Sequence, residues 1–586
     1  MMQKQRTVTF NHNPLLKREL PVWRSRFVLM VLLGCLLVLV GRALFLQGID
    51  NEFLQAKGEM RYARVLEVPA TRGRITDRNG DMFAVSTPVR SIWAIPTDVS
   101  LEPGEARQLA RLLEMDVAEL NAKLASGRDF AYLKRQLSPD VAERIAALKL
   151  TGIHEQREYR RFYPGGEVTA HMLGFTSVED RGQEGIELAY EAQLAGQPGS
   201  RRVIKDRRGQ VVEDVESIRP PRDGEDVVLA MDGKIQYLAY SALRDAMQKY
   251  RAKAGAVVVV DVQTGEVLAL ANAPTFNPNN RANLTGTQLR NRAFTDTFEP
   301  GSVMKPFVAA LALESGKFKA TTKIDTSPGR LTIGSATIGD AHVHGILTVA
   351  EVIQKSSNVG TVKMALQFSP DEMWHLLDGL GFGSQLNLGF PGEATGRLRP
   401  AKSWRPIEQA TMSYGHGISV SLIQLAHAYL AFARDGDLLP LSLTRVDTPK
   451  AAPKRIFSPT VAREVRGMLE MAAGPGGTAP QAQVPGYRVA GKTGTAYKIE
   501  GGQYVKKYVS SFVGLAPASR PRLVVAVMID EPNGAHYGGA VAAPVFARIV
   551  EGSLRALGVA PDSPITPLQL ARKQGAEAAT AVRESM

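Results

Sequence analysis

The sequence predicts a multidomain α+β protein that one helix near the N-terminus anchors in a membrane. Its 586 residues exceed the ~250–300 at which a single core stops growing, so more than one domain is expected. An apolar run close to the N-terminus is long enough to cross a bilayer. In the second half, β-rich runs stand at both ends of a helical middle, which is typical of an antiparallel sheet covered by helices.

The first element is the apolar run from Phe27 to Leu46, which only Arg42 interrupts. About 20 residues span ~30 Å of hydrocarbon, and an arginine near one end can reach the interface. A cleaved signal peptide is the alternative, but the run is long for one and no small-x-small cleavage site follows. Residues 1–26 hold six Lys or Arg against one acidic residue. We therefore predict an uncleaved inner-membrane helix over 27–46, with 1–26 cytoplasmic and all later residues periplasmic.

Net charge and cysteine content narrow the possible functions. The net charge of +13 would suit nucleic acid, but no zinc-ligand spacing, RNA-binding aromatic motif or basic arm accompanies it, so nucleic-acid binding is not predicted. A basic exterior also suits an anionic membrane surface or an acidic cell-wall polymer. The only cysteine, Cys35, lies inside the apolar run. The exported part therefore has neither a disulfide nor a cysteine nucleophile.

Residues 47–222 are predicted to form an extended α+β pedestal. A short helix is expected over 51–66 and a clear helical stretch over 105–124, among short apolar segments separated by Gly, Pro and Asn turns. A turn-rich segment crowds four charges together, Arg72, Arg74, Asp77 and Arg78. Internal ion pairing is one explanation of these charges, and contact with partner proteins is the other.

The predicted catalytic domain covers 223–557 and begins after the breaker run at 220–224. Residues 256–262 and 267–271 are β-rich and are joined by a four-residue turn, which predicts a hairpin. The other predicted elements are helices over 303–314 and 348–367, strands over 508–515 and 523–529, and a closing helix over 545–557. Residues 558–586 are rich in Pro, Ala and polar residues and are predicted to be a disordered tail.

Three short motifs follow one another in the catalytic domain: Ser302-Val303-Met304-Lys305, Ser356-Ser357-Asn358 and Lys492-Thr493-Gly494. Together they supply a nucleophile, two candidate bases and a site for an anion, as in an acyl-transferring serine enzyme. Because Pro300-Gly301 precedes Ser302, we expect Ser302 at a helix start, where the helix dipole favours a developing oxyanion. Lys305 lies one turn later and must be neutral to accept the serine proton. Burial and the charge of Lys492 would lower its pKa.

The other motif residues have candidate roles in proton transfer and substrate binding. Ser356 can relay a proton between Lys305 and the leaving amine, and Asn358 can bind the amide of the substrate. Lys492 offers a positive charge to a carboxylate on an edge strand, where Gly494 lets the substrate approach the backbone. Taken singly, the first two motifs also fit helix caps and the third fits a β-turn.

Two histidine-containing segments are less informative. Asp340, His342 and His344 have a spacing that could attract a metal, but no further ligand is evident and no metal or other cofactor is predicted. His416 is expected to be structural or to line the cleft.

The motifs and their surroundings resemble those of class B penicillin-binding proteins, especially the peptidoglycan transpeptidases specific to cell division. The segments that carry the resemblance are RGRITDRNG (72–80), RRFYPGG (160–166), GQEGIE (182–187), AGAVVVVDVQTGEVLALAN (254–272), KSSNVG (355–360), SYGHGISVS (413–421) and AGKTGTA (490–496).

This resemblance implies a pedestal of the dimerisation type followed by a penicillin-recognising transpeptidase domain. It also implies that Ser302 and Thr495 supply the backbone N–H groups of an oxyanion hole, and that the hydroxyls of Thr493 and Thr495 hold the terminal carboxylate. The expected substrate is a peptidoglycan stem peptide ending in D-Ala-D-Ala, and β-lactams are expected inhibitors. A glycan polymerase of the FtsW type, other division proteins and a septal location are expected as well.

Three alternatives remain open from the sequence. A D,D-carboxypeptidase or a serine β-lactamase uses the same motifs with water as acceptor, although the anchor and the pedestal favour a transpeptidase. An elongation-type transpeptidase uses the same acyl-serine mechanism, and the resemblance favours the division type chiefly through FEPGS (298–302) and the overall length. A scaffold with a dead site is disfavoured because Ser302, Lys305 and Lys492 are all present.

Overall fold

The computed structural model describes residues 21–49, 63–125, 128, 130–205, 211–447 and 452–564, and these form two compact units. The first unit holds the chain up to Pro69 together with Pro198–Pro221. The second holds Ala70–Gln197 and everything from Arg222 onward. All catalytic motifs and most of the predicted pedestal belong to the second unit.

The first unit contains the N-terminal apolar helix and a small sheet. Helix α1 covers Val22–Leu44 and a short π-helix follows at Phe45–Ile49. Residues 22–47 form one candidate membrane span with a mean hydropathy of 2.6, which indicates single-pass anchoring. The helix begins five residues before the predicted anchor, because Val22 and Trp23 extend its apolar surface.

The small sheet is antiparallel, in the order β1 (Ala63–Val68), β6 (Gly199–Lys205) and β7 (Val211–Arg219). The helix predicted over 51–66 is therefore wrong for residues 63–66, which pair with β6 instead. Cross-strand pairing decides the conformation of such short segments more strongly than helix propensity does. The rest of that prediction lies outside the described residues.

The pedestal part of the second unit is a sheet covered on one face by helices. The long strand β3 (Met82–Ala94) lies between β4 (Ala131–Leu137) and β5 (Ile153–Phe162), and β2 (Ile75–Thr76) connects it to β8 (Val227–Val228). Three helices cover one face with a leucine-rich core: α3 (Pro103–Leu112), α4 (Val117–Leu124) and α5 (Pro139–Ala146). The helix predicted over 105–124 is thus two helices, because the chain turns at Glu114, which has a φ of 51°.

The catalytic part is built on a five-stranded antiparallel sheet in the order β10-β9-β21-β20-β19. Its strands are β9 (Ala254–Asp261), β10 (Val267–Ala273), β19 (Ala490–Glu500), β20 (Gln503–Ala516) and β21 (Leu523–Asp530). The predicted hairpin and the two late strands are confirmed, and β19 is an edge strand as expected.

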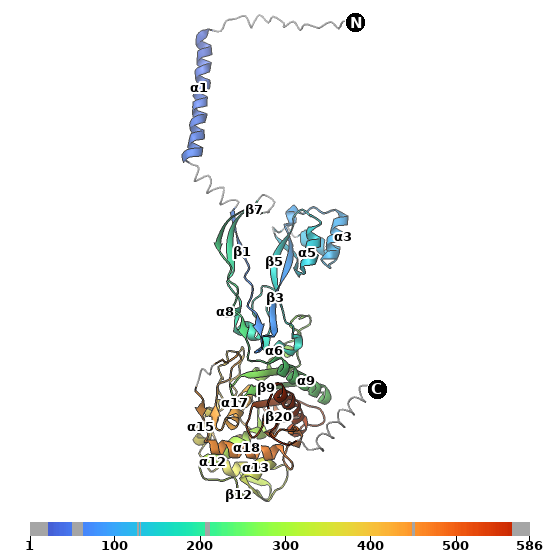
Figure 1. Cartoon of the computed structure of the whole chain (residues 1–586), viewed down its shortest axis with the longest axis vertical. Coiled ribbons are helices and arrows are strands. Elements are labelled where there is room, and N and C mark those ends of the chain that lie inside the picture. The colour runs from blue at the N-terminus through green and yellow to red at the C-terminus, as the bar shows by residue number, and fades with distance from the viewer. Residues whose placement is uncertain are drawn as a thin grey trace. The chain divides into compact units, whose positions relative to one another are not determined.

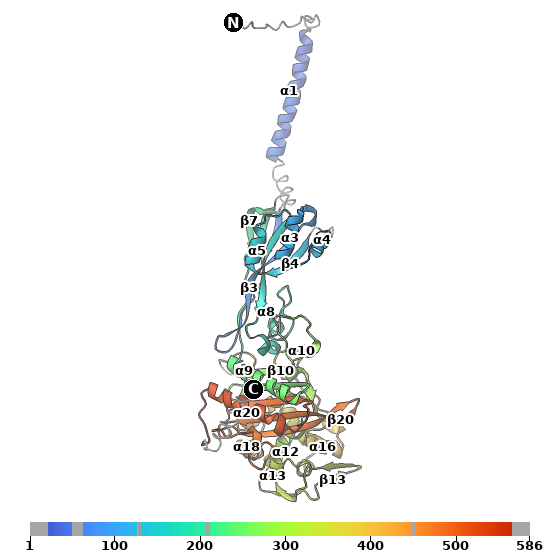
Figure 2. The same ribbon diagram turned by 90° about the vertical axis from the view of Figure 1, so that its right-hand side faces the viewer.

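Helices cover both faces of this sheet (Figures 1 and 2). On one face, α9 (Gly233–Tyr250) and α20 (Ala543–Ala556) pack against Val257, Val259 and their neighbours. On the other face, α12 (Lys305–Glu314), α17 (Leu422–Ala433) and α18 (Pro459–Ala473) pack against Val258 and Val260. The alternation of valines along β9 therefore produces two cores, one on each side of the sheet.

The helix predicted over 348–367 is also two helices, and the break falls at the second motif. Helix α13 (Val349–Lys355) ends where Ser356 adopts a left-handed conformation with φ 60°. Ser357 then caps α14 (Asn358–Ala365) by accepting a hydrogen bond from the Gly360 N–H. Because the Ser357 cap starts a new helix, α13 does not continue into α14. Ser356 therefore lies in the corner between the two helices.

Short elements complete the second unit. The helices are α6 (Ala170–Leu173), α7 (Gly185–Ala189), α8 (Glu191–Leu194), α10 (Gly286–Leu289), α11 (Arg292–Thr295), α15 (Pro370–Gly379), α16 (Pro406–Ser413) and α19 (Gly538–Val541). The strand pairs are β11 (Thr297–Phe298) with β16 (Val420–Ser421), β12 (Lys323–Asp325) with β15 (Ile346–Thr348), β13 (Arg330–Ile333) with β14 (Ala336–Gly339), and β17 (Asp437–Leu438) with β18 (Lys454–Arg455).

The chain after α20 keeps contact with the domain for several residues. Asp562 accepts hydrogen bonds from the backbone N–H of Arg488 and from the Ser519 hydroxyl. The predicted tail therefore begins no earlier than residue 565, and residues 565–586 lie outside the described residues.

The four charges of the pedestal turn are paired within the protein. Arg72, which is 1% exposed, contacts Glu187 at 2.6 Å, and Arg161 contacts the same carboxylate at 2.7 Å. Glu187 is itself fully buried. A carboxylate shared by two buried guanidinium groups satisfies charges that would otherwise be very costly to bury.

The other three charges of this turn fix neighbouring segments. The Asp77 carboxylate accepts hydrogen bonds from the backbone N–H groups of Asn79, Asp81 and Gly233. Arg78 pairs with Glu266 at 3.2 Å. Internal ion pairs therefore explain Arg72 and Arg78, and internal hydrogen bonds explain Asp77, whereas Arg74, paired with Asp226, is exposed.

Candidate active site

Ser302 lies in a tight turn that leads into α12. The turn is a 3₁₀ helix, Gly301–Met304, and Gly301 has a φ of 63°, which favours glycine. The Gly301 N–H donates to the Gly415 carbonyl at 3.2 Å, and the Val303 carbonyl accepts from the buried Tyr429 hydroxyl at 2.8 Å. Ser302 is half-buried, and its Oγ has no hydrogen-bond partner among the described residues. The prediction that it stands at a helix start is confirmed.

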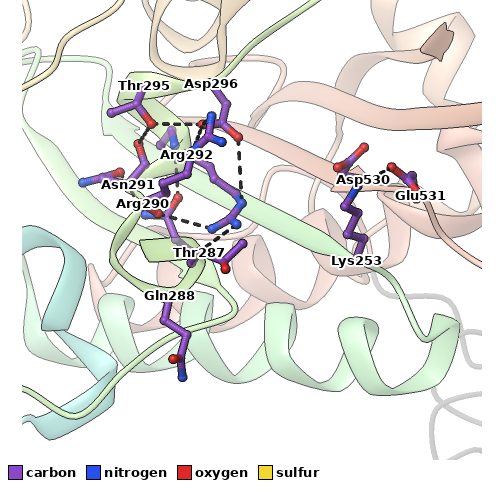
Figure 3. A network of polar contacts seen from close by, with 12 residues as sticks. Lys253, Thr287, Gln288, Arg290, Asn291, Arg292, Thr295, Asp296, Asp530 and Glu531 are labelled. Carbon is purple, nitrogen blue, oxygen red and sulfur yellow. Dashed lines mark hydrogen bonds and ion pairs between the residues drawn. The ribbon is translucent and has the colours of Figure 1, made fainter. Parts of the chain in front are cut away.

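The chain just before this turn is fixed by a polar network on and around α11 (Figure 3). Arg292 is buried and donates to the Thr287 carbonyl at 3.0 Å. Asp296 contacts Arg290 at 2.6 Å and accepts from the Thr295 hydroxyl at 3.0 Å. These contacts hold the start of β11, which leads directly to the Ser302 turn.

Lys305 is fully buried at the start of α12 and reaches the corner between α13 and α14. Its Nζ donates to the Ser356 carbonyl and lies 3.2 Å from the Ser356 Oγ. Burial lowers the pKa of Lys305 well below its ordinary value, the nearby charge of Lys492 lowers it further, and Asp340 opposes the shift. The predicted influence of Lys492 on this pKa is therefore present.

Lys492 approaches the same hydroxyl from the edge strand β19. Its Nζ lies 2.9 Å from the Ser356 Oγ and 3.3 Å from the Thr493 Oγ1, and burial lowers the pKa of Lys492 to about 7. The Ser356 Oγ thus lies within hydrogen-bond distance of two ammonium groups. Because a hydroxyl has two acceptor sites and one proton, Ser356 can accept from both lysines and still donate its proton to a third group.

The corner that carries Ser356 is held by Asp340, whose role the sequence analysis missed. The Asp340 carboxylate accepts from the Ser357 hydroxyl at 2.7 Å and from the backbone N–H groups of Asn358 and Val359. A carboxylate here also matches the positive N-terminal end of α14. Its spacing to His342 had indicated only a possible metal ligand, and the described residues contain no group of three or more side chains that could hold a metal.

Asn358 lies beside this corner, and its side-chain amide makes one hydrogen bond within the described part of the chain. Its Nδ2 donates to the Gly339 carbonyl at 2.7 Å, which uses one of its two amide hydrogens and orients the side chain. The side-chain oxygen and the second hydrogen remain able to bind a peptide amide.

The third motif brings two hydroxyls to the edge of the sheet. The Thr493 Oγ1 lies 2.9 Å from the Thr478 Oγ1, and the Thr495 Oγ1 accepts from the Gly538 N–H at 3.1 Å. The sequence predicts that Gly494 lets the substrate approach the backbone, but the structure shows that a side chain here would collide with the protein itself. A Cβ at this position would lie 2.7 Å from the Pro300 carbonyl oxygen and 2.3 Å from the Ser511 Oγ. The glycine therefore lets β19 pack against the segment that carries Ser302.

Glu299 and Tyr504 lie beside His416 and Gly417, and the sequence did not indicate a role for either residue. The Glu299 carboxylate accepts from the Gly417 N–H at 2.7 Å and from the Tyr504 hydroxyl at 3.0 Å. The His416 ring lies between Tyr414 and Tyr504, with centroid distances of 5.0 and 5.8 Å. Burial lowers the pKa of His416.

Comparisons with known proteins identify both halves of this architecture. The penicillin-binding protein transpeptidase domain model matches residues 255–551, and the penicillin-binding protein dimerisation domain model matches residues 67–229. The chain is similar to the "Probable peptidoglycan D,D-transpeptidase PenA" of Neisseria gonorrhoeae, with 45% identity over 93% of this chain and 94% of that protein.

Two further proteins give the same result. The "Peptidoglycan D,D-transpeptidase FtsI" of Escherichia coli strain K12 is 42% identical over 92% of this chain and 93% of that protein. The solved transpeptidase domain of Burkholderia pseudomallei penicillin-binding protein 3 is 52% identical, covers 57% of this chain and 98% of its own, and has a TM-score of 0.53. The chain therefore belongs to the class B penicillin-binding proteins.

Proposed function

We propose that this chain is a peptidoglycan D,D-transpeptidase that works through an acyl-enzyme on Ser302. The main support is the Ser356 hydroxyl, which lies 3.2 and 2.9 Å from the Nζ atoms of two buried lysines. Burial and the neighbouring charge of Lys492 lower the pKa of Lys305, which favours the neutral amine that a general base requires. The names of the similar proteins agree with this activity.

In the first half-reaction, the Ser302 Oγ attacks the carbonyl carbon of the penultimate D-Ala while its proton passes to the neutral amine of Lys305. Backbone N–H groups of Ser302 and Thr495 stabilise the oxyanion. The bond to the terminal D-Ala then breaks, and its nitrogen takes the proton of Ser356, which a neighbouring lysine restores. Free D-Ala leaves, and an ester remains on Ser302.

In the second half-reaction, an amine from another stem peptide attacks the ester. The amine loses its proton to the lysine pair, Ser302 regains a proton as the ester breaks, and a new peptide bond cross-links the two strands. During the first half-reaction, the hydroxyls of Thr493 and Thr495 and the charge of Lys492 hold the carboxylate of the leaving D-Ala, and Asn358 holds the peptide amide.

Labelled penicillin tests this assignment on the full-length protein. Peptide mapping should place the label on Ser302, and Ser302→Ala should remove it. A label on another residue, or full labelling of Ser302→Ala, would contradict the assignment. Turnover of a stem-peptide donor with and without an amine acceptor distinguishes a transpeptidase from a D,D-carboxypeptidase, because only the transpeptidase forms the cross-linked product.

The cellular setting follows from the anchor and the family. We propose an inner-membrane protein with residues 1–26 in the cytoplasm, 27–46 in the membrane, a periplasmic pedestal over 47–222 and a catalytic domain over 223–557. A septal role with an FtsW-type polymerase is proposed from the division-type relatives. Depletion should give filamentous cells that still elongate, whereas rounded cells would support the elongation-type alternative.

A further inference from the structure

We propose that Lys355 is a positioning residue for the carboxylate-binding threonines of the site. This proposal rests on the proposed function and deepens it. Lys355 stands immediately before Ser356 and is exposed. Its Nζ donates to the Gly476 carbonyl at 2.9 Å, although the two residues are 121 positions apart in the sequence.

Gly476 belongs to the loop of residues 474–479, which connects α18 to the 3₁₀ helix Pro480–Ala482 that precedes β19. Thr478 of this loop shares a 2.9 Å hydrogen bond with Thr493, and the Thr493 Oγ1 lies 3.3 Å from the Lys492 Nζ. Lys492 in turn contacts Ser356, the neighbour of Lys355. The polar contacts therefore form a circuit from Lys355 to its neighbour Ser356, by way of Gly476, Thr478, Thr493 and Lys492.

The rest of the loop is packed closely, so its position decides where the Thr478 hydroxyl lies. A Cβ on Gly477 would lie 2.3 Å from the Ala472 carbonyl oxygen, and one on Gly539 would lie 2.2 Å from the Thr478 carbonyl oxygen. Gly476 itself is exposed and has a φ of 77°. The Lys355 ammonium is the side-chain donor that holds this exposed part of the loop, among the contacts of the described residues.

The expected consequence is selective for ligands that carry a carboxylate. Without the Lys355 contact, the exposed part of the loop loses its side-chain donor, and the Thr478 hydroxyl is held less precisely against the Thr493 hydroxyl that it orients. The Ser302, Lys305 and Ser356 groups keep their other contacts. A ligand with a free carboxylate should therefore acylate more slowly, while its methyl ester should acylate as before.

The experiment measures the second-order acylation rate of the full-length protein in detergent with benzylpenicillin and with its methyl ester. Lys355→Met should slow benzylpenicillin about fivefold and the ester less than about twofold, the range expected for one exposed hydrogen bond. Lys355→Arg keeps a donor and should restore most of the rate. Lys317→Met is the matched control, because the exposed Lys317 donates to the Gln367 carbonyl at 2.8 Å in the same manner but outside this circuit.

A double-mutant cycle separates positioning from direct contact between Lys355 and the ligand. If Lys355 acts through the loop, Lys355→Met combined with Thr478→Val should be no slower with benzylpenicillin than the slower single variant. Additive losses would show that Lys355 contacts the carboxylate itself and would overturn the proposal. Equal losses for acid and ester, or no loss for Lys355→Met, would overturn it too. Failure of the wild type to form any adduct at Ser302 would instead refute the proposed function.

Discussion

Two groups of buried cations in the second unit differ in whether they contact a carboxylate. At the base of the pedestal, Arg72 and Arg161 share the carboxylate of Glu187 at 2.6 and 2.7 Å. In the site, Lys305 and Lys492 are equally buried, yet within the described part of the chain neither ammonium contacts a carboxylate. Both instead contact one serine.

The pKa values follow this difference. Burial alone would lower the pKa of Arg72, but Glu187 and Glu191 raise it above its ordinary value. For Lys305, burial and Lys492 both act downward, and Asp340 opposes them only from a distance. The first group is built to remain charged and hold the fold, and the second is built to give up a proton.

The largest effect is expected for Lys305→Arg. Guanidinium keeps the positive charge but cannot act as a base near neutral pH, so acylation by penicillin should fall by about 10³-fold. Stopped-flow or gel-based acylation rates on folded, full-length protein measure this loss. A rate within about tenfold of wild type would mean that Lys305 acts only through its charge and that another group takes the proton.

The next largest effect is expected for Glu187→Gln in the pedestal. The change leaves two buried guanidinium groups without their shared carboxylate and should cost about 3–5 kcal/mol of unfolding free energy. Thermal unfolding measures the loss. Acylation per folded molecule should stay near wild type below the melting transition. If acylation fell while thermal stability was unchanged, Glu187 would belong to the catalytic machinery and the comparison would fail.

An intermediate effect concerns pH. Lys492, with a pKa of about 7, is charged below this pH and neutral above it, whereas Lys305 must be neutral to act as a base. Acylation by a ligand with a carboxylate should therefore rise with pH as one lysine of the pair deprotonates and fall as the second does. With the methyl ester the falling limb should be weaker, because Lys492 has no carboxylate to hold. Identical profiles for acid and ester would contradict the assigned role of Lys492.

The smallest effect is expected at Arg74. Its pair with Asp226 is exposed, and exposed ion pairs contribute little to stability. Arg74→Ala should leave the melting temperature and penicillin labelling unchanged. A division defect in cells carrying this variant would support partner contact through Arg74, whereas a parallel loss of stability and labelling would make the residue structural.

Local patterns in the sequence predicted much of the site. The Ser-x-x-Lys spacing placed Ser302 and Lys305 one helical turn apart, and the edge position of β19 followed from its glycine and polar residues. The roles of Asp340, Glu299, Lys355 and Thr478 depend on partners distant in the sequence, which no spacing rule reveals. The motif Ser356-Ser357-Asn358 falls within the helix predicted over 348–367, but the Ser357 cap places it at the corner of two helices.

Fold predictions succeeded where the signal is local and failed where a neighbouring strand or a single backbone conformation decides the structure. The hairpin of β9 and β10 and the late strands β20 and β21 carry strong local signals, and the structure confirms them. Residues 63–66 read as helix by propensity but form a strand because β6 lies beside them. The sequence predicts one helix across Glu114 and one across Ser356, but each is two helices. A single residue in the left-handed conformation ends a helix without changing the spacing of the apolar residues.

A direct test of Lys305 as the general base is to titrate the two lysines of the site. Protein labelled with ¹³C at lysine Cε gives one signal per lysine, and the Lys305→Arg and Lys492→Arg variants assign the two signals from the site. These two signals should shift at lower pH than those of the exposed lysines, with a midpoint near pH 7 for Lys492. Titration of both signals together with the exposed lysines would show that the pair stays charged, and would contradict the claim that Lys305 is the base.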